Sequence, residues 1–531
     1  MQPFEIVFLL LAVVAAMTLV SRRIGVPYPI LLLIAGLLLG AIPGSPLYME
    51  LDDEIVLLVF LPPILFSAAY LSSPRELWRN IRPISLLAVG LVIITTAAVA
   101  VVAMVLIPPL GWPLAVALGA IVSPPDAIAA TSIARSLNLP RRLVTILEGE
   151  SLVNDATALT FYALAVAAIG ASSIGPLDVV TRFAIVVIGG SLVGAIVGRI
   201  TVWLLDLLDD SPVEVLLTLL TPFAAYLPAE QIGVSGVLAT VTAGLVVGWS
   251  APRVMTSRTR LLGTSSWQMV IFVVNGLAFL LVGLQLPNVL GDIEGYSAGE
   301  LIGLAAAVCA TVIIVRLIWI YPATYVPRWL FPSIARRDPA PPARVPLILG
   351  WGGMRGAVTL AAALGLPTQI DGAELEGRGL IIFLSFSVIV VTLLGQGLTL
   401  PTLIKRLNVS GEDDLEHEEL HARTVATEAA LVRLEELRNE APNHLPLIDQ
   451  LKERYEHRTE HLVHDHDDGP PSTEELTEQQ VEEMEHDEIR RAVISAERLA
   501  VLGLRDAGEI SEDALHAVER DLDLDELRRE A

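Results

Sequence analysis

A chain of 531 residues that is 53% hydrophobic, with a mean hydropathy of +0.62, is too apolar to be an ordinary soluble protein. The net charge of −24 comes almost entirely from one end, because residues 407–531 hold 36 acidic and 13 basic residues while residues 1–406 hold 23 and 22. This acidic balance argues against nucleic acid as a partner. The single cysteine, Cys309, excludes an intrachain disulfide. We therefore expect a membrane domain at 1–406 and an acidic soluble domain at 407–531.

Thirteen apolar runs are long enough, or nearly so, to cross a bilayer as helices, since a span needs about 20 residues. They lie at about 4–20, 28–42, 52–71, 83–108, 113–136, 142–170, 178–205, 213–228, 232–249, 267–287, 299–325, 344–366 and 378–402. The runs at 28–42 and 213–228 are the shortest and could be re-entrant or merely buried helices. Residues 1–5 lack the basic segment of a signal peptide, so we expect the first helix to be retained. The predicted fold class is an all-α membrane protein with 13 transmembrane helices.

Basic residues are unevenly distributed among the loops. They gather in the odd-numbered loops and after the last run: Arg22, Arg23, Arg75, Arg79, Arg82, Arg135, Arg141, Arg142, Arg253, Arg258, Arg260, Arg328, Arg336, Arg337, Arg344, Lys405 and Arg406. The seventh loop, with Asp206, Asp209 and Asp210, does not follow the pattern. Because cytoplasmic loops carry the excess of Lys and Arg, we expect a multi-pass protein of the cell (plasma) membrane with its N-terminus outside and its C-terminal tail in the cytoplasm.

Two of the runs are interrupted at corresponding places. The fifth contains Ser-Pro-Pro-Asp at 123–126, where two prolines remove two amide donors and break the helix. The twelfth contains Gly-Trp-Gly-Gly-Met-Arg-Gly at 350–356, which is rich enough in glycine to unwind. The breaks are seven runs apart, which predicts two inverted six-helix repeats with crossed discontinuous helices 5 and 12. Paired breaks point to the midplane site of a transporter, because unwound backbone is tolerated only inside protein or along a cavity.

The most informative residues lie in the sixth run, where Glu-Ser-Leu-Val-Asn-Asp occupies 150–155. A charge at the bilayer centre costs about 3 kcal/mol, so such residues usually face a bundle interior and mark ion or proton pathways. Ser151, Asn154 and Asp155 are spaced i, i+3 and i+4 and share one helical face. Asp155 offers hard oxygens to an alkali cation and can bind a proton instead, with Asn154 and Ser151 orienting it or completing the coordination. The alternative is that Asp155 is a structural polar anchor between helices.

Four other polar residues fall within apolar runs. Asp126, at the first break, either balances the positive ends of half-helices or approaches the cation. Arg355, at the second break, cannot lose its proton, so we expect a structural ion pair with Glu150. Arg316 lies toward the cytoplasmic end of its run and can extend its charge to the interface. Asn275 is expected to join helices by hydrogen bonding.

The acidic domain is expected to be mostly helical. Apolar residues at near-helical spacing predict helices within 412–463, 473–503 and 511–529. The histidines and aspartates at 461–468 could bind a metal, but a solvated linker is favoured because no cysteine or closed four-ligand spacing supports a site. The sequence of the acidic domain does not indicate which regulatory ligand this domain binds.

Several of these segments resemble the monovalent cation:proton antiporters typified by bacterial NhaP and animal NHE proteins. The matching segments are Glu-Ser-Leu-Val-Asn-Asp-Ala at 150–156, Phe-Leu-Pro-Pro-Ile-Leu-Phe at 60–66, Arg-Gly-Ala-Val at 355–358, and Asn-Gly-Leu at 275–277 with Gly-Leu-Gln-Leu at 283–286. The resemblance covers residues 1–406. It implies a homodimeric transporter, not an enzyme, in which each protomer has a dimerisation domain and a mobile core domain. It also implies that the Asn154–Asp155 pair accompanies electroneutral exchange of one cation for one proton, that Ser151 is a ligand or orients one, and that Glu150 and Arg355 stabilise each other.

Two positions depart from the family pattern. At 125–127, Pro-Asp-Ala replaces the usual Thr-Asp-Pro, so a threonine often found at the site is missing. Ser67 stands where many relatives carry a glutamate that pairs with the arginine. We therefore expect Arg355 to depend more heavily on Glu150.

These observations predict an exchanger of Na⁺ or Li⁺ for H⁺, with Asp155, Ser151 and Asp126 near the ion and no cofactor beyond the transported ions. Exchange of K⁺ is the first alternative, because selection depends on cavity size and ligand number. An intramembrane aspartyl protease using Asp126 and Asp155 is a distant alternative, since the Gly-x-Gly-Asp and Tyr-Asp contexts of those enzymes are absent. A channel or sensor is disfavoured because nothing resembles a repeated filter sequence.

Overall fold

The computed structural model describes residues 3–42, 53–72, 74–137, 139–169, 176–285, 293, 295–370 and 373–409, with short pieces between 431 and 455. The chain forms two compact units, Met1–Glu412 and Asp413–Ala531. The helices predicted at 473–503 and 511–529 and the stretch at 461–468 lie outside the described residues.

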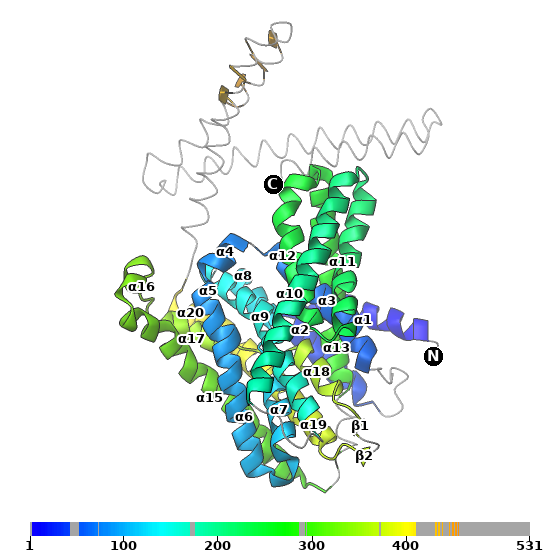
Figure 1. Ribbon diagram of the computed structural model, residues 1–531, viewed down its shortest axis with the longest axis vertical. Coiled ribbons are helices and arrows are strands. Elements are labelled where there is room, and N and C mark those ends of the chain that lie inside the picture. Colours follow the sequence, from blue (N-terminus) through cyan, green and yellow to red (C-terminus); the bar gives the residue numbers. More distant parts are fainter. Residues whose placement is uncertain are drawn as a thin grey trace. The chain divides into compact units, whose positions relative to one another are not determined.

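The described part of the first unit is helical, apart from one short antiparallel pair of strands, β1 (Gln369–Ile370) and β2 (Ala373–Glu374) (Figure 1). The helices are α1 (Pro3–Ile24), α2 (Tyr28–Gly40), α3 (Asp53–Leu71), α4 (Pro74–Arg79), α5 (Ile81–Ser85), η1 (Leu86–Leu91), α6 (Val92–Leu106), η2 (Pro108–Leu110), α7 (Gly111–Val122), α8 (Ala127–Ser136), α9 (Arg141–Ala168), α10 (Pro176–Leu207), α11 (Ser211–Gln231), α12 (Gly236–Val254), α13 (Ser257–Leu284), α15 (Ala298–Leu330), α16 (Pro332–Arg337), α17 (Arg344–Trp351), α18 (Ala357–Leu364), α19 (Arg378–Val390), η3 (Val391–Gln396) and α20 (Gly397–Leu407). Nine of the described helices are long and apolar enough to cross a membrane, and three shorter ones are apolar. Each of the predicted apolar runs falls on a helix or on a pair of half-helices.

Both predicted interruptions are present. The first broken helix stops at the end of α7, Val122, and resumes at Ala127, the start of α8, so its two prolines lie in the break. There their missing amide donors disrupt no helical hydrogen bond. The second stops at Trp351 and resumes at Ala357, with three glycines between them.

The contacts between helices of this unit group them into two bundles. The site bundle contains α5–α9, α15 and α17–α20, and the second bundle contains α1–α3 and α10–α13. Small residues let helices of the second bundle approach closely: a Cβ on Gly194 of α10 would lie 2.1 Å from the carbonyl oxygen of Ala239 of α12. The bundles meet through apolar side chains, where Leu61 of α3 packs with Leu152 of α9 and Val241 of α12.

Candidate ion site

The two helix breaks lie against each other. The backbone N–H of Asp126, in the first break, donates to the carbonyl of Met354, in the second, at 2.7 Å. Position 356 has no room for a side chain, because a Cβ on Gly356 would lie 1.7 Å from Oδ2 of Asp126. The unwound segments of the two discontinuous helices therefore meet, and a glycine at 356 allows it.

Asp126 caps the second half of its own broken helix. Its Oδ1 accepts a hydrogen bond from the backbone N–H of Ile128, in the first turn of α8, at 2.8 Å. The first N–H groups of a helix have no partner within the helix and carry partial positive charge, so a carboxylate is stabilised there. Of the two roles that the sequence left open for Asp126, this contact matches the balancing of a half-helix end.

Arg355 caps the first half of the same helix from the other break. Its side chain is fully buried; Nε donates to the carbonyl of Val122 at 3.0 Å, and Nη2 donates to that of Ser123 at 3.2 Å. These carbonyl groups lie at the C-terminal end of α7, where no further N–H group of the helix can donate to them. The negative end of the helix dipole also favours a cation there. Nη1 also donates to the carbonyl of Gly353, and the backbone N–H donates to Oγ1 of Thr392 at 3.0 Å. Arg355 is thus satisfied by backbone carbonyls.

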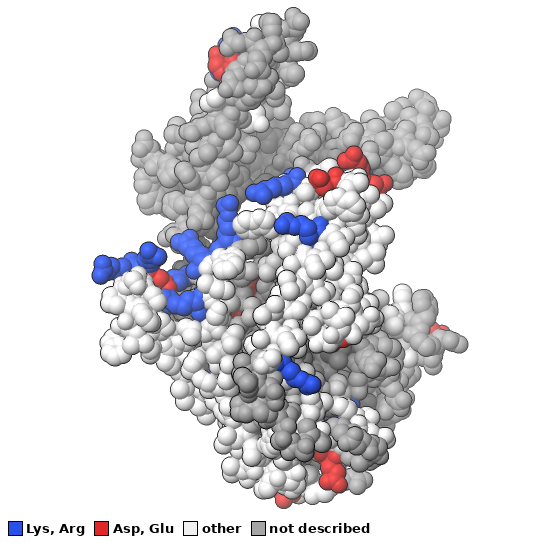
Figure 2. All heavy atoms as spheres, in the orientation of Figure 1, with Lys and Arg blue, Asp and Glu red and all other residues white. Residues whose placement is uncertain are grey.

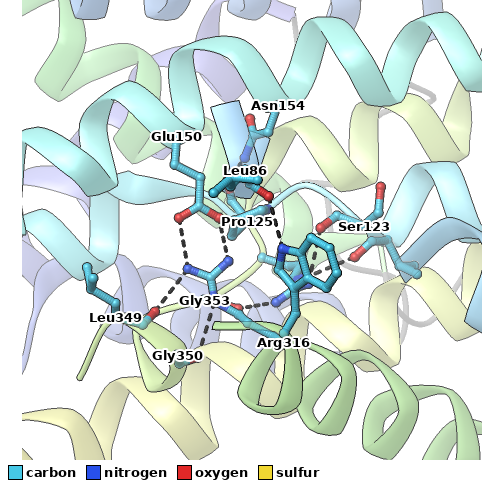
Figure 3. A network of polar contacts seen from close by, with 12 residues as sticks. Leu86, Ser123, Pro125, Glu150, Asn154, Arg316, Leu349, Gly350 and Gly353 are labelled. Atoms are coloured by element: carbon cyan, nitrogen blue, oxygen red, sulfur yellow. Dashed lines mark hydrogen bonds and ion pairs between the residues drawn. The ribbon is translucent and has the colours of Figure 1, made fainter. Parts of the chain in front are cut away.

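The buried ion pair differs from the predicted one. Glu150 accepts two hydrogen bonds from Arg316 of α15, from Nη1 at 2.5 Å and from Nη2 at 3.0 Å, and neither side chain is more than 1% exposed (Figure 3). The predicted Glu150–Arg355 ion pair is therefore wrong. The physical reason is that the end of α7 already occupies the donors of Arg355, which leaves the glutamate to the arginine of α15.

Arg316 does not extend to the interface, so that expectation is also wrong. It donates to the carbonyls of Leu349 and Gly350 at 3.0 and 3.2 Å, at the end of α17 (Figure 3). Gly353 leaves the space for this, since a Cβ there would lie 2.2 Å from Cδ of Arg316. The signal in the sequence was that Arg316 lies within an apolar run, since a buried charge needs acceptors in the protein interior.

Asn154 and Asp155 lie beside the first break. Asn154 is wholly buried; its Nδ2 donates to the carbonyl of Pro125 at 2.9 Å (Figure 3), and its Oδ1 has no hydrogen-bond partner among the described residues. Asp155 is 5% exposed and accepts no hydrogen bond from the part of the chain that the structure describes. Asp126 is close enough for its charge to act on Asp155. Ser151, one turn earlier on α9, is partly buried.

This arrangement leaves oxygen ligands without compensating donors in the interior. The Asp155 carboxylate and the Oδ1 of Asn154 are hard oxygens of the kind that suit alkali cations. An ionised carboxylate buried in this way is costly when it is alone, so it favours either a bound proton or a bound cation. Either occupant neutralises the same charge.

Two further residues singled out in the sequence are buried in the second bundle. Ser67, where many relatives carry a glutamate, donates to the carbonyl of Ile64 within its own helix at 2.8 Å. Asn275 of α13 is buried, and its Oδ1 has no hydrogen-bond partner within the described ranges. Its side chain interacts with that of Tyr28 of α2, which agrees with the helix-joining role expected for it.

A helical membrane protein with a buried acid beside two touching helix breaks has the architecture of a secondary transporter. The chain matches the family described as "Sodium/hydrogen exchanger, transmembrane" over residues 8–406. It is 36% identical over 533 residues to an uncharacterised Na⁺/H⁺ exchanger of Mycobacterium bovis, which covers 98% of this chain and 95% of that protein. It is 33% identical over 454 residues to the sodium, potassium, lithium and rubidium/H⁺ antiporter of Bacillus pumilus. That alignment covers 83% of this chain and 67% of the antiporter.

A solved structure agrees with this assignment at the level of the fold. The sodium proton antiporter MjNhaP1 from Methanocaldococcus jannaschii superimposes with a TM-score of 0.59 at 18% identity, covering 76% of this chain and 98% of that one. The chain belongs to the Na⁺/H⁺ exchanger family, of the NhaP type. It is a multi-pass membrane protein and a monovalent cation/H⁺ antiporter, not an enzyme. The resemblance predicted from four motifs is confirmed, and the protease alternative is wrong.

Proposed function

We propose that this antiporter exchanges Na⁺ or Li⁺ for H⁺ in a ratio of 1:1, with cation and proton competing for Asp155. The observation that carries the proposal is the isolation of this carboxylate, which is buried and receives no hydrogen bond from a described donor. One carboxylate holds one compensating charge at a time. Each cation carried one way is then matched by one proton carried the other way, and no net charge moves.

Asp155 is the shared ligand in this proposal, and three neighbours support it. Ser151 is one turn away on the same face of α9 and is assigned to the ion's ligand set. The charge of Asp126 acts on Asp155, and a cation near both carboxylates would relieve their repulsion. Asn154 fixes this face of α9 to the break through its hydrogen bond to Pro125.

Potassium is the second candidate cation. The relative from Bacillus pumilus is named for sodium, potassium, lithium and rubidium, which favours a site of broad selectivity. All of these ions accept hard oxygen ligands, so the choice rests on cavity size and ligand number. The assay described below therefore includes K⁺.

Alternating access would come from movement of one bundle against the other. The site bundle holds both breaks, Asp155 and the two capping arginines, so the ion site can move as one body. Apolar contacts such as Leu61 with Leu152 can slide without the loss of hydrogen bonds. We assign the second bundle to a homodimer interface, the odd-numbered loops and the acidic domain to the cytoplasm, the N-terminus to the outside, and the protein to the cell membrane.

The proposal is tested in everted membrane vesicles that hold a proton gradient, read by a pH-sensitive dye. Addition of Na⁺ or Li⁺ should dissipate the gradient, and a separate arm with K⁺ measures the alternative. Asp155→Asn should abolish the response to every cation, whereas Asp209→Asn, at an exposed loop aspartate, should retain it. Clamping the membrane potential at zero should leave the rate unchanged. Exchange by folded Asp155→Asn protein would overturn the central assignment, and a rate that follows the potential would overturn the 1:1 ratio.

A further inference from the structure

A basic cavity lies outside the ion site, where α4, α5 and α16 meet. Its volume is about 210 Å³, and its charged lining residues are Arg79, Arg82, Arg337 and Asp338. A cavity needs only about 10–15 Å³ to hold one water, so this one has room for a larger group. Figure 2 shows Lys and Arg side chains gathered over this part of the molecule.

The only acid among these lining residues is already neutralised. Asp338 forms ion pairs with Arg142 at 2.9 Å, with Arg328 at 2.8 Å and with Arg82. Burial by itself would raise the pKa of Asp338, but the hydrogen bonds and charges of Arg142 and Arg328 outweigh it and lower the pKa to about 2. Its carboxylate is therefore ionised near neutral pH. Three arginines share this one negative charge and leave a formal charge of +2.

Two more arginines complete the lining. Arg79 ends α4 and Arg337 ends α16; both are exposed, and neither side chain forms an ion pair or hydrogen bond with any residue in the described ranges. They raise the formal charge around the cavity to +4. A guanidinium keeps its charge at any physiological pH and can give two parallel hydrogen bonds to a phosphate. The chemistry of the lining therefore fits a phosphate group.

Large exposed apolar side chains lie close in the chain to the residues that line the cavity. Trp78, beside Arg79 in α4, is 75% exposed; Trp329 and Phe331, just before α16, are 80% and 56% exposed. Tryptophan is enriched at the membrane–water interface, where its ring lies at the level of the headgroups. These neighbours fit a cavity at the depth where lipid phosphates lie.

We propose that this cavity binds the phosphate of an anionic phospholipid headgroup, with Arg79 and Arg337 as its outer contacts and Arg82 behind them. Basic pockets at the ends of membrane helices bind such headgroups. The carboxylate of Asp338 joins Arg82 of α5 to the ends of α9 and α15 through Arg142 and Arg328. A bound lipid therefore tethers the helix that carries the ion site to the membrane surface. The proposal does not depend on which cation is exchanged.

The test measures thermal unfolding of the full chain, purified in a neutral detergent, while short-chain phosphatidylglycerol is added. The lipid should raise the Tm of the wild type at concentrations where phosphatidylcholine of the same chain length does not. Arg79→Gln/Arg337→Gln should need at least about tenfold more phosphatidylglycerol for the same shift. The matched control is Arg22→Gln/Arg23→Gln, which removes the same charge from exposed arginines at the first odd-numbered loop and should behave as the wild type. Equal responses of the two double variants would overturn the proposal.

Two further arms identify the occupant. Inorganic phosphate at the same concentration should give no comparable shift, and an equal shift would identify a site for a free anion instead of a lipid. In the second arm, a photocrosslinker is attached to Ser333→Cys, in the cavity lining, with Cys309→Ala removing the native thiol. In membranes containing phosphatidylglycerol it should label lipid. Labelling of residues 413–531 instead would make the acidic domain the occupant and overturn the lipid proposal.

Discussion

Arg316 and Arg355 perform the same task on the two broken helices. Arg316 donates to the last carbonyls of α17, and Arg355 donates to the last carbonyls of α7. In each case a guanidinium that cannot lose its proton lies at the negative end of a half-helix. Only Arg316 also holds a carboxylate, that of Glu150. The breaks are therefore stabilised by two arginines with different partners, and their energetic contributions should be separable.

The first prediction concerns the buried ion pair. Glu150→Gln should destabilise the protein by about 3–5 kcal/mol, because it leaves the charge of Arg316 buried without its carboxylate. The control is Arg141→Gln, which removes an ion pair whose arginine is 58% exposed and should cost about 1 kcal/mol or less. Thermal and denaturant unfolding in detergent give both values. Similar losses in the two variants would show that burial adds nothing to the Glu150–Arg316 pair.

A double-mutant cycle tests which arginine belongs to Glu150. Combining Glu150→Gln with Arg316→Gln should give a stability loss well below the sum of the single losses, because residues that share hydrogen bonds are coupled. When Glu150→Gln is combined with Arg355→Gln, the loss of stability should be closer to the sum of the two single losses, because Arg355 is held by backbone carbonyls. A larger coupling in the second cycle than in the first would contradict the pairing described above.

Gly356 is predicted to be intolerant of a methyl group. A Cβ there would lie 1.7 Å from Oδ2 of Asp126, so Gly356→Ala must displace that carboxylate or part the two breaks. Exchange should slow by about tenfold or more, because misplacement of a site by about 1 Å is enough for such losses. Gly303→Ala is the control, since a Cβ at 303 meets nothing within 4 Å. Exchange rates in vesicles, divided by the amount of folded protein, are measured for both variants. Normal exchange by Gly356→Ala would mean that the two helix breaks can move apart without loss of function.

The charge of Asp338 should stabilise the folded protein by an amount that depends on pH. Its pKa is lowered from the ordinary value of 3.8 to about 2, so its charge stabilises the fold fully above about pH 4, and this contribution is lost as the pH falls toward 2. Asp338→Asn should therefore be less stable than the wild type at pH 6, by a margin that shrinks at pH 3. Asp209→Asn should match the wild type at both values. A margin that is the same at pH 6 and pH 3 would contradict the role of the charge.

The features that could be predicted from the sequence have local causes. Proline and glycine act on their own backbone, so both breaks follow from composition, and an acid inside an apolar run, such as Asp155, is too costly to face lipid. The partner of Glu150 has no local cause. Arg316 and Arg355 both lie in apolar runs, and the choice between them depends on which helix end each one meets after folding. Gly353 was visible as part of a break, but its use as space for Arg316 is a property of the packing.

The final prediction follows from competition at Asp155. When a proton and a cation exclude each other on one carboxylate, each lowers the affinity for the other by the same factor. In proteoliposomes, each drop of one pH unit should then raise the KM for Na⁺ by up to about tenfold, while the rate at saturating Na⁺ is unchanged. Asn154→Ala should raise the KM at every pH without changing this slope, because it removes the unpartnered Oδ1 and the hydrogen bond to Pro125 but leaves the shared carboxylate in place. A KM that is independent of pH would show that the two ions bind separately. A slope steeper than tenfold per pH unit would require a second proton, for which Asp126, whose charge acts on Asp155, is the candidate acid.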